Sequence, residues 1–305
     1  METSELLRNI TTLPVISGSL AEEMLAGNFR SIFKGHGMEF DEARHYEPGD
    51  DIRSIDWNAS ARFGTPFVKM YREERELTIL LLIDISPSMH RGSFAVSNIS
   101  PYEQGLISSA LIAFSAEHTG QQVGAFFFDR DIERVFPPRK GRHHIMALIM
   151  AALQYQNNRQ ARKEKIGSNI ASALKGAQRL LKRRSLVVLI SDFYSVNWEQ
   201  EMINLCRKHD VIALRICDSG VLPYPGLITL EDPETGVRIE APAGLSSFKD
   251  SWSQWHRERS ISWASQCRRC GASFLELSTD ADVPSSLLKF FSSHGKNIYK
   301  RRKRA

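Results

Sequence analysis

The chain has 305 residues, of which 42% are hydrophobic and 25% are charged, a composition typical of a globular protein of one or two domains. Its apolar runs are far shorter than the ~20 residues of a membrane-spanning helix. Residues 1–25 lack the basic start and apolar core of a signal peptide, and four cysteines fit a reducing compartment. We therefore expect a cytoplasmic protein without a membrane span. Five of the 40 basic residues lie in residues 300–305, and without them 35 basic residues balance 35 acidic ones.

Residues 1–34 contain two sets of apolar side chains at helical spacing, separated by Pro14 and the run Ser17-Gly18-Ser19. The two sets are Leu6, Leu7, Ile10 and Leu13, then Leu20, Met24, Leu25 and Phe29. We interpret this stretch as an N-terminal helical extension whose apolar stripes pack on the main body. A helix that binds a partner is the alternative.

Residues 35–76 form a segment with an unusual density of charges beside aromatic side chains. Its Pro48-Gly49 pair is a turn signal, because proline presets φ and glycine permits φ > 0. Three arginines of this segment can form bidentate ion pairs with four carboxylates. These residues are Arg44, Arg53 and Arg62 with Glu39, Asp50, Asp51 and Asp56. The favoured interpretation is an ion-paired clasp over the edge of the main sheet, with Tyr46 and Trp57 as buried anchors. A ligand site is the alternative.

Residues 77–83 make a short, nearly continuous apolar run, which is typical of a strand buried on both faces in the middle of a parallel sheet. The run ends at Asp84, and Ser86 and Ser88 follow at alternate positions. A carboxylate at the carboxyl end of a central strand points into the crevice where open α/β sheets bind ligands. Because Mg²⁺ takes oxygen ligands, this loop can supply one side of its coordination shell. A turn whose side chains bond their own backbone is the alternative.

Two further loops bring oxygen-bearing side chains after the first one. Ser168 precedes a predicted helix, and the apolar run 186–190 ends in Ser191-Asp192. This three-loop pattern resembles the metal-ion-dependent adhesion site (MIDAS) of von Willebrand factor A domains. The resemblance implies that one Mg²⁺ (or Mn²⁺) is held by Asp84, Ser86, Ser88, Ser168 and Asp192. The family usually has threonine where Ser168 stands, and serine keeps the hydroxyl but lacks the methyl that restricts its rotamer.

The remaining elements alternate between strands and helices. Predicted helices cover residues 102–118, 143–153, 169–181, 198–208, 246–270 and 285–294, and predicted strands cover 123–128, 132–136, 211–216 and 274–277. This alternation favours an α/β fold with a doubly wound, mostly parallel sheet flanked by helices. We assign the A-like, Rossmann-type domain to residues 77–295, with a hairpin insertion at 227–240 and an exposed basic loop at 155–165. Residues 296–305 are assigned to a basic tail, interpreted as a disordered end.

Four motifs within residues 35–62 indicate a family. They are Gly35-x-Gly37-x-Glu39-Phe40, Arg44-x-Tyr46-x-Pro48-Gly49-Asp50, Arg53-x-Ile55-Asp56-Trp57 and Ser60-Ala61-Arg62. Together they resemble the signature of the domain-of-unknown-function 58 (DUF58) family, and the resemblance covers about residues 32–291. It implies an A-type domain directly after the signature, in a short form without the membrane helices of many relatives. It also implies a MoxR-type AAA+ ATPase as partner.

The motifs that would indicate an enzyme are missing from the sequence. There is no P-loop and no recognisable nucleophile motif, and Ser86 stands where a phosphatase with an aspartate nucleophile would have a second aspartate. We therefore expect a non-enzymatic interaction module, without a small-molecule substrate, that docks acidic residues of a partner in chaperone-like complex assembly. One alternative is a metal-dependent hydrolase that uses Asp84 or Asp192 to orient water. Another is a nucleic-acid binder that uses the basic tail.

Overall fold

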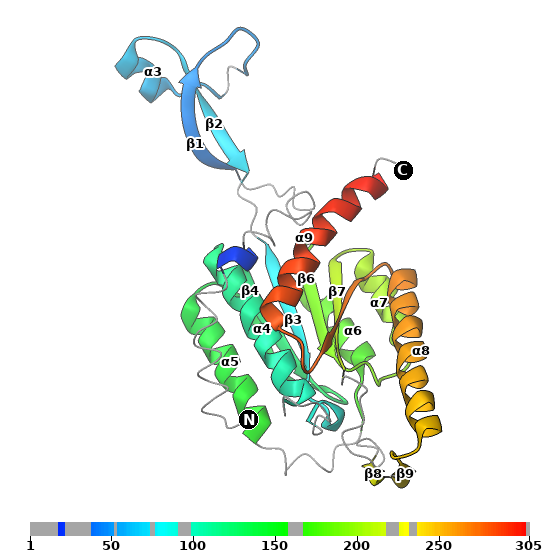
Figure 1. Cartoon of the computed structure of the whole chain (residues 1–305). Helices are drawn as coiled ribbons and strands as arrows, with labels where there is room; N and C mark the ends of the chain where they lie inside the picture. The colour runs from blue at the N-terminus through cyan, green and yellow to red at the C-terminus, as the bar shows by residue number, and fades with distance from the viewer. Residues whose placement is uncertain are drawn as a thin grey trace. The chain divides into compact units, whose positions relative to one another are not determined.

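The computed structural model describes residues 18–21, 38–51, 54–73, 77–90, 99–157, 167–217, 226–231 and 237–302. The chain divides into two compact units. The larger unit comprises Met1–Phe29 together with Leu77–Ala305, and the smaller unit comprises Arg30–Glu76 (Figure 1).

A six-stranded sheet is the centre of the larger unit, with the strand order β10-β7-β6-β3-β4-β5. Its strands are β3 (Thr78–Asp84), β4 (Gln122–Phe128), β5 (Ile132–Arg139), β6 (Leu186–Ser191), β7 (Asp210–Cys217) and β10 (Ser273–Ser278). Neighbouring strands are parallel except for β5, which pairs with β4 in the antiparallel direction. The prediction of a doubly wound, mostly parallel sheet with the run 77–83 as an interior strand is therefore confirmed.

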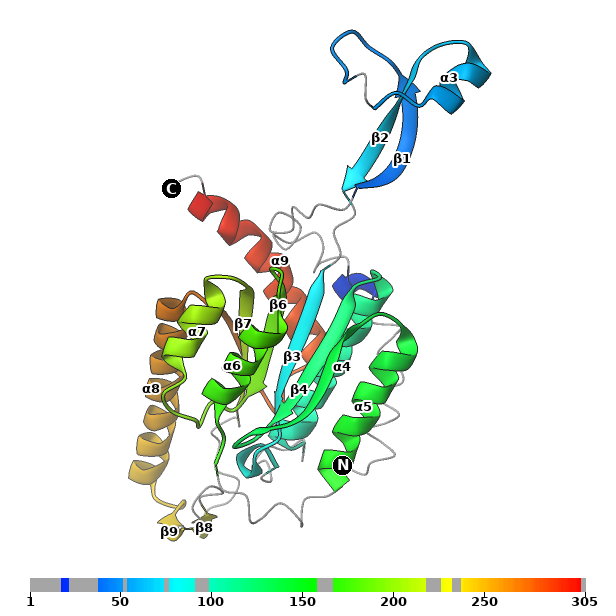
Figure 2. The ribbon, with the colours of Figure 1, turned by 180° about the vertical axis from the view of Figure 1, so that it is seen from behind.

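Helices cover both faces of this sheet (Figures 1 and 2). One face carries α4 (Pro101–His118), α5 (Arg142–Asn157) and α9 (Val283–Arg302), and the other carries α6 (Ile170–Leu180), α7 (Glu199–Cys206) and α8 (Ser246–Cys270). Because both faces are covered, residues 79–82 of β3 are fully buried. On the second face Leu80 and Leu82 share a core with Leu174 of α6 and Trp263 of α8. Among the described residues, no helix combines the length and the apolar character needed to cross a bilayer.

Two predicted helices end well before the helices of the structure do. Helix α9 does not end at His294 but continues to Arg302, so it takes in most of the predicted basic tail, and a disordered end is wrong for that part. Helix α5 continues to Asn157, so Tyr155 lies in this helix rather than in an exposed loop. The Tyr155 ring packs 5.2 Å from the ring of Phe127, which explains why the helix continues to this residue.

The described part of the larger unit contains two antiparallel hairpins, of which the second is the predicted insertion. Strands β4 and β5 pair at the edge of the sheet, and β5 runs on through Pro137-Pro138, which an edge strand tolerates. In the predicted insertion, β8 (Leu227–Glu231) pairs with β9 (Arg238–Pro242) in the antiparallel direction. The turn between β8 and β9, residues 232–236, lies outside the described residues.

Of the predicted N-terminal extension, the structure describes residues 18–21, which form one helical turn. Leu20 and Ala21 of this turn are buried, so this part of the extension contributes to the apolar core. The rest of residues 1–34 lies outside the described part of the chain.

The smaller unit consists of a two-stranded sheet and one short helix. Strand β1 (Met38–His45) pairs with β2 (Phe67–Glu73), and α3 (Trp57–Phe63) lies between them in the sequence. The Asp56 side chain caps α3 by accepting hydrogen bonds from two backbone N–H groups. No residue of α3 is buried, and the Trp57 side chain is 69% exposed. The prediction of Trp57 as a buried anchor is wrong, because a two-stranded sheet with one short helix encloses too little volume to bury it.

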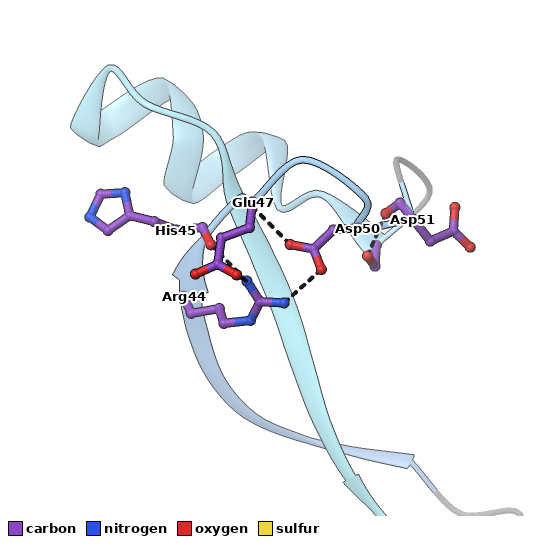
Figure 3. Close-up of polar contacts among 6 residues, drawn as sticks. Arg44, His45, Glu47, Asp50 and Asp51 are labelled. Atoms are coloured by element: carbon purple, nitrogen blue, oxygen red, sulfur yellow. Dashed lines mark hydrogen bonds and ion pairs between the residues drawn. The ribbon is translucent and has the colours of Figure 1, made fainter.

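An ion-paired turn closes one end of this unit (Figure 3). Arg44 Nη2 donates to Asp50 Oδ1 at 2.6 Å, and the Glu47 N–H donates to Asp50 Oδ2 at 2.9 Å. These two hydrogen bonds hold the pKa of Asp50 below its usual value. The predicted pairing of Arg44 with Asp50 is confirmed, whereas Arg53 lies outside the described residues. Packing of this segment on the main domain stays a prediction.

Candidate metal centre

The candidate site lies where the winding of the sheet reverses. Strands β3 and β6 are parallel neighbours, but the chain continues from β3 to β4 on one side and from β6 to β7 on the other. Such a reversal leaves a crevice at the carboxyl ends of the two strands, which is where open α/β sheets bind ligands. Asp84 ends β3 and Ser191 ends β6, so both are placed at this crevice.

The loop after β3 folds tightly around Asp84. The Asp84 carboxylate is fully buried, and its Oδ1 accepts a hydrogen bond from the Ser86 N–H at 2.9 Å. The short 3₁₀ helix η2 (Pro87–His90) then turns the chain so that Ser86 Oγ and Ser88 Oγ lie 3.0 Å apart. Both serine side chains are fully buried although they are polar. Three oxygen-bearing groups of one loop thus converge beneath the surface.

The loop before α6 brings Ser168 to the same carboxylate. Ser168 Oγ donates to Asp84 Oδ2 at 2.8 Å. Its neighbour Asn169 is the N-cap of α6, and the Asn169 N–H donates to the backbone oxygen of Asp129 at 2.8 Å. Asp129, which directly follows β4, therefore holds this loop beside β3.

The last residue of β6 and the loop that follows it supply two more side chains. Ser191 Oγ donates to Asp84 Oδ2 at 2.6 Å and accepts from the Phe193 N–H at 3.0 Å. Asp192 is buried, and its Oδ1 accepts from the Tyr194 N–H at 3.2 Å. Ser191 was not among the predicted ligands, because its place beside Asp84 depends on the register between β3 and β6, which pairs Ile83 with Ile190.

Backbone strain is stored in this last loop. Phe193 has φ 56°, a left-handed conformation that costs a bulky residue about 1–3 kcal/mol. Its ring is held by edge-on contacts with Trp198 and Trp263, at centroid distances of 5.5 and 5.2 Å. These aromatic contacts hold the loop that carries Asp192.

The electrostatics of the crevice favour a cation. Burial raises the pKa of Asp84 to about 7, and the neighbouring carboxylate of Asp192 contributes in the same direction. Hydrogen bonds from Ser191 and Ser86 oppose this rise. Two carboxylates that share a buried crevice repel each other, and a bound cation would remove that repulsion.

The oxygen spacing, which is that of hydrogen bonds, is also compatible with an octahedral ion. Two adjacent ligands of Mg²⁺, each about 2.0–2.1 Å from the ion, lie about 3 Å apart. The pair Ser86 Oγ and Ser88 Oγ is separated by 3.0 Å, and the pair Ser168 Oγ and Asp84 Oδ2 by 2.8 Å. The donor set of hydroxyls and carboxylates also suits Mg²⁺ or Mn²⁺ better than a soft metal. Among the described residues, no group of three or more His, Cys, Asp or Glu side chains could hold a metal. Metal binding here would therefore depend on the serines.

The structure places all five predicted side chains at one crevice, drawn from three loops that are far apart in the sequence. Asp84, Ser86, Ser88 and Ser168 are linked through hydrogen bonds, and Asp192 lies near enough to raise the pKa of Asp84. Metal binding by this set stays a prediction.

Two solved structures that are similar to this chain have low sequence identity to it and TM-scores below 0.5. One is an aerotolerance-related membrane protein from Bacteroides fragilis, 16% identical with a TM-score of 0.44, covering 72% of this chain and 98% of that chain. Another is the SpRpn10 VWA domain, 12% identical with a TM-score of 0.38, covering 70% of this chain and 94% of that chain.

Relatives of known sequence cover nearly the whole chain. An uncharacterized protein of Mycobacterium tuberculosis is 27% identical over 296 residues, which is 96% of this chain and 91% of the relative. An uncharacterized protein of Mycobacterium avium is 28% identical over 160 residues, which is 52% of this chain and 92% of the relative. The family model described as "Protein of unknown function DUF58" matches residues 42–260, well over half of the chain. The chain therefore belongs to the DUF58 family, as its signature motifs predicted.

Proposed function

We propose that this protein is a non-enzymatic interaction module that binds Mg²⁺ (or Mn²⁺) in the crevice between β3 and β6 and docks an acidic side chain of a protein partner. The observation that carries the proposal is the convergence of three loops on Asp84 Oδ1 and Oδ2, with oxygen spacing that suits an octahedral cation. Asp84, Ser86, Ser88, Ser168 and Asp192 would hold the ion.

The bound ion would supply a positive charge and a coordination position that the protein leaves open. Five side chains cannot fill an octahedron of six positions, so one position remains for a carboxylate oxygen from outside. Asp84 and Asp192 neutralise the ion, while the serine hydroxyls orient Asp84 and bridge the loops. Docking of a carboxylate at the open position requires neither a nucleophile nor a general base. Docking is therefore a simpler use of this site than bond cleavage.

The partner that we propose is a MoxR-type AAA+ ATPase of the same cell, in the cytoplasm. The signature motifs of residues 35–62 support this choice, since the resemblance that they carry implies such an ATPase as companion. An assembly role would need reversible contact, and a metal-gated carboxylate contact is reversible because either the ion or the acidic residue can leave.

The test is a binding measurement between the purified protein and the purified MoxR-type ATPase, with Mg²⁺ and with EDTA. We expect association in Mg²⁺, loss of association in EDTA, and at least about tenfold weaker association for Asp84→Asn, because a charge-assisted contact is typically worth more than 1.4 kcal/mol. Asp210→Ala is the matched control, since it removes a carboxylate at the opposite, amino end of β7. Circular dichroism would establish that both variants fold.

Equal association with EDTA and with Mg²⁺ would contradict the proposal, and so would wild-type affinity in Asp84→Asn. An effect of Asp210→Ala as large as that of Asp84→Asn would show that carboxylate removal acts through general stability rather than through the metal site.

A further inference from the structure

The first part of α8 exposes an aromatic surface. Only Trp263, Cys267 and Cys270 of this 25-residue helix are buried, so its first four turns contribute no buried side chain. Along these turns, four ring-bearing residues follow each other at helical spacing on one side of the helix. They are Phe248, Trp252, Trp255 and His256, and we call them the aromatic rim.

The rings of the aromatic rim contact each other. Phe248 stacks on Trp252 with a centroid distance of 6.1 Å, and Trp252 stacks on Trp255 at 5.7 Å. His256 lies 4.9 Å from both tryptophan rings. The Trp255 side chain is nevertheless 44% exposed. Clustered, pre-ordered aromatic side chains at a surface are the typical anchors of protein interfaces, since little conformational entropy is lost when a partner covers them.

Apolar side chains from neighbouring segments are exposed at the same end of the sheet. Among the described residues, eleven large hydrophobic side chains are exposed, and six of them lie in the β6–α7 loop, the β8–β9 hairpin and the start of α8. These six are Val196, Leu227, Val237, Ile239, Leu245 and Trp255. The hairpin and the first turns of α8 lie at the end of the sheet where η2 follows β3 (Figures 1 and 2). Exposed apolar side chains that gather in one region mark an interaction surface.

One arginine joins the aromatic rim to the candidate metal centre. Arg259 of α8 donates to the backbone oxygen of Phe193 at 3.2 Å, and Phe193 directly follows the predicted ligand Asp192. The Arg259 guanidinium also stacks 3.6 Å from the Tyr194 ring centroid and 5.5 Å from that of Trp255. The Arg259 side chain therefore contacts both the loop that carries Asp192 and the aromatic rim. A molecule bound at one would lie beside the other.

The charge of this region points to a protein partner. The described residues from 226 to 259 carry four basic and four acidic side chains, which balance. They are Arg238, Lys249, Arg257 and Arg259, with Glu231, Glu240, Asp250 and Glu258. Nucleic acid and anionic membranes bind through an excess of positive charge, which this region lacks. A neutral surface with exposed aromatic rings suits an apolar segment of a protein.

We propose that the aromatic rim is a second docking surface, which receives an apolar segment of the same protein partner whose carboxylate completes the metal site. The inference rests on the proposed function, because it places the two contacts on one partner. The metal contact would select an acidic side chain, and the rim would supply most of the buried area beside it.

The experiment compares Trp255→Ala with Met150→Ala in two measurements, Mg²⁺ titration by calorimetry and association with the MoxR-type ATPase in Mg²⁺. Met150 is a matched control because it is an apolar residue of α5 that is 48% exposed, against 44% for Trp255. We expect both variants to bind Mg²⁺ as wild type does, and only Trp255→Ala to associate about tenfold more weakly or worse. Trp255→Phe, which keeps an aromatic ring, should recover part of the loss.

The outcomes separate this inference from the proposed function. If Trp255→Ala associates as Met150→Ala does while Asp84→Asn loses association, the rim is not a docking surface and the metal-dependent function stands. If Trp255→Ala loses association while EDTA and Asp84→Asn have no effect, the rim is supported and the metal-dependent function is contradicted. Absence of any association between the wild-type protein and the ATPase contradicts both.

Discussion

Asp84 ties together three segments of the chain through the two oxygens of one side chain. Oδ1 accepts from the Ser86 N–H, and Oδ2 accepts from the hydroxyls of Ser168 and Ser191. Each donor comes from a different loop, so the conformation of the crevice depends on this carboxylate. Burial of a carboxyl group beside Asp192 is costly unless the group is protonated or a cation is bound.

The cost of burying this carboxylate predicts that the free energy of unfolding of the metal-free protein depends on pH in an unusual way. Burial raises the pKa of Asp84 to about 7 in the folded state, against the ordinary 3.8 expected for the unfolded chain. Between these values the folded state holds a proton that the unfolded state lacks, so the free energy of unfolding falls as pH rises through this window. We expect urea unfolding in EDTA to show a lower free energy of unfolding at pH 7.5 than at pH 5, by a few kcal/mol at most.

Asp84→Asn is the control for this prediction, because an amide keeps the shape of the side chain and does not titrate. The difference between the two pH values should shrink in the variant. If wild type and Asp84→Asn lose the same free energy of unfolding between pH 5 and 7.5, Asp84 is not the group that titrates.

The contacts and burial of individual residues were the hardest features to predict from the sequence. Asp84, Ser86 and Ser88 were identified from local patterns, the end of a strand and alternate spacing, whereas Ser168 and Asp192 joined the set through the resemblance to von Willebrand factor A domains. Ser191 was missed because its role depends on the register between β3 and β6, which are about a hundred residues apart in the chain. Trp57 was predicted to be buried because large aromatic rings usually are. It is exposed because the surrounding unit is too small to enclose it.

At the scale of elements, α4 packs against two elements beside the candidate metal centre, η2 and β6. Its first turns pack closely on β6 and on η2, since a Cβ at Gly105 would lie 3.0 Å from Ile190 Cγ2 and 3.5 Å from Met89 Cε. The helix is buried on nearly all sides, and its serines satisfy their hydroxyls by donating to backbone oxygens one turn earlier, as Ser108 does to Gln104. An element buried to this degree depends strongly on a well-formed first turn.

A capping box supplies that first turn. Ser100 Oγ accepts from the Glu103 N–H at 3.2 Å, and Glu103 Oε2 accepts from the Ser100 N–H at 2.7 Å. We expect Ser100→Ala to lower the free energy of unfolding by about 1 kcal/mol, because it leaves a buried N–H without its acceptor. Urea denaturation with an unchanged m value would measure this, and Ser100→Thr, which keeps the hydroxyl, should lose less. Equal stability of wild type and Ser100→Ala would show that the capping box does not support the helix.

The positions of helices and strands along the chain could be predicted well because apolar periodicity is a local pattern. The residues at which helices end could not be predicted as well. The prediction ended the last helix at His294, before Gly295, which is a common helix terminator. The helix instead continues to Arg302, since glycine in a helix costs only about 1 kcal/mol relative to alanine. Similarly, α5 extends over Tyr155 because a tertiary contact with Phe127 outweighs the polar sequence around it.

At the scale of the whole molecule, the order of the strands creates the site. In chain order the strands of the sheet follow the doubly wound pattern, in which the first and fourth strands, here β3 and β6, lie side by side. The alternation of strands and helices predicted this class of fold, because connections between parallel strands follow few topologies. It did not predict that Arg30–Glu76 forms a compact unit of its own, since a two-stranded sheet with one short helix leaves only a weak pattern in the sequence.

The most direct test of the central claim is calorimetric titration of Mg²⁺ into metal-stripped protein, with wild type, Asp84→Asn and the control Asp210→Ala in parallel. The account predicts saturable binding at one site for wild type and for Asp210→Ala, and none for Asp84→Asn, because Asp84 is the carboxylate on which all three loops converge. Absence of binding by wild type, or equal binding by Asp84→Asn, would contradict it, and the crevice between β3 and β6 would then be a hydrogen-bonded junction without a metal.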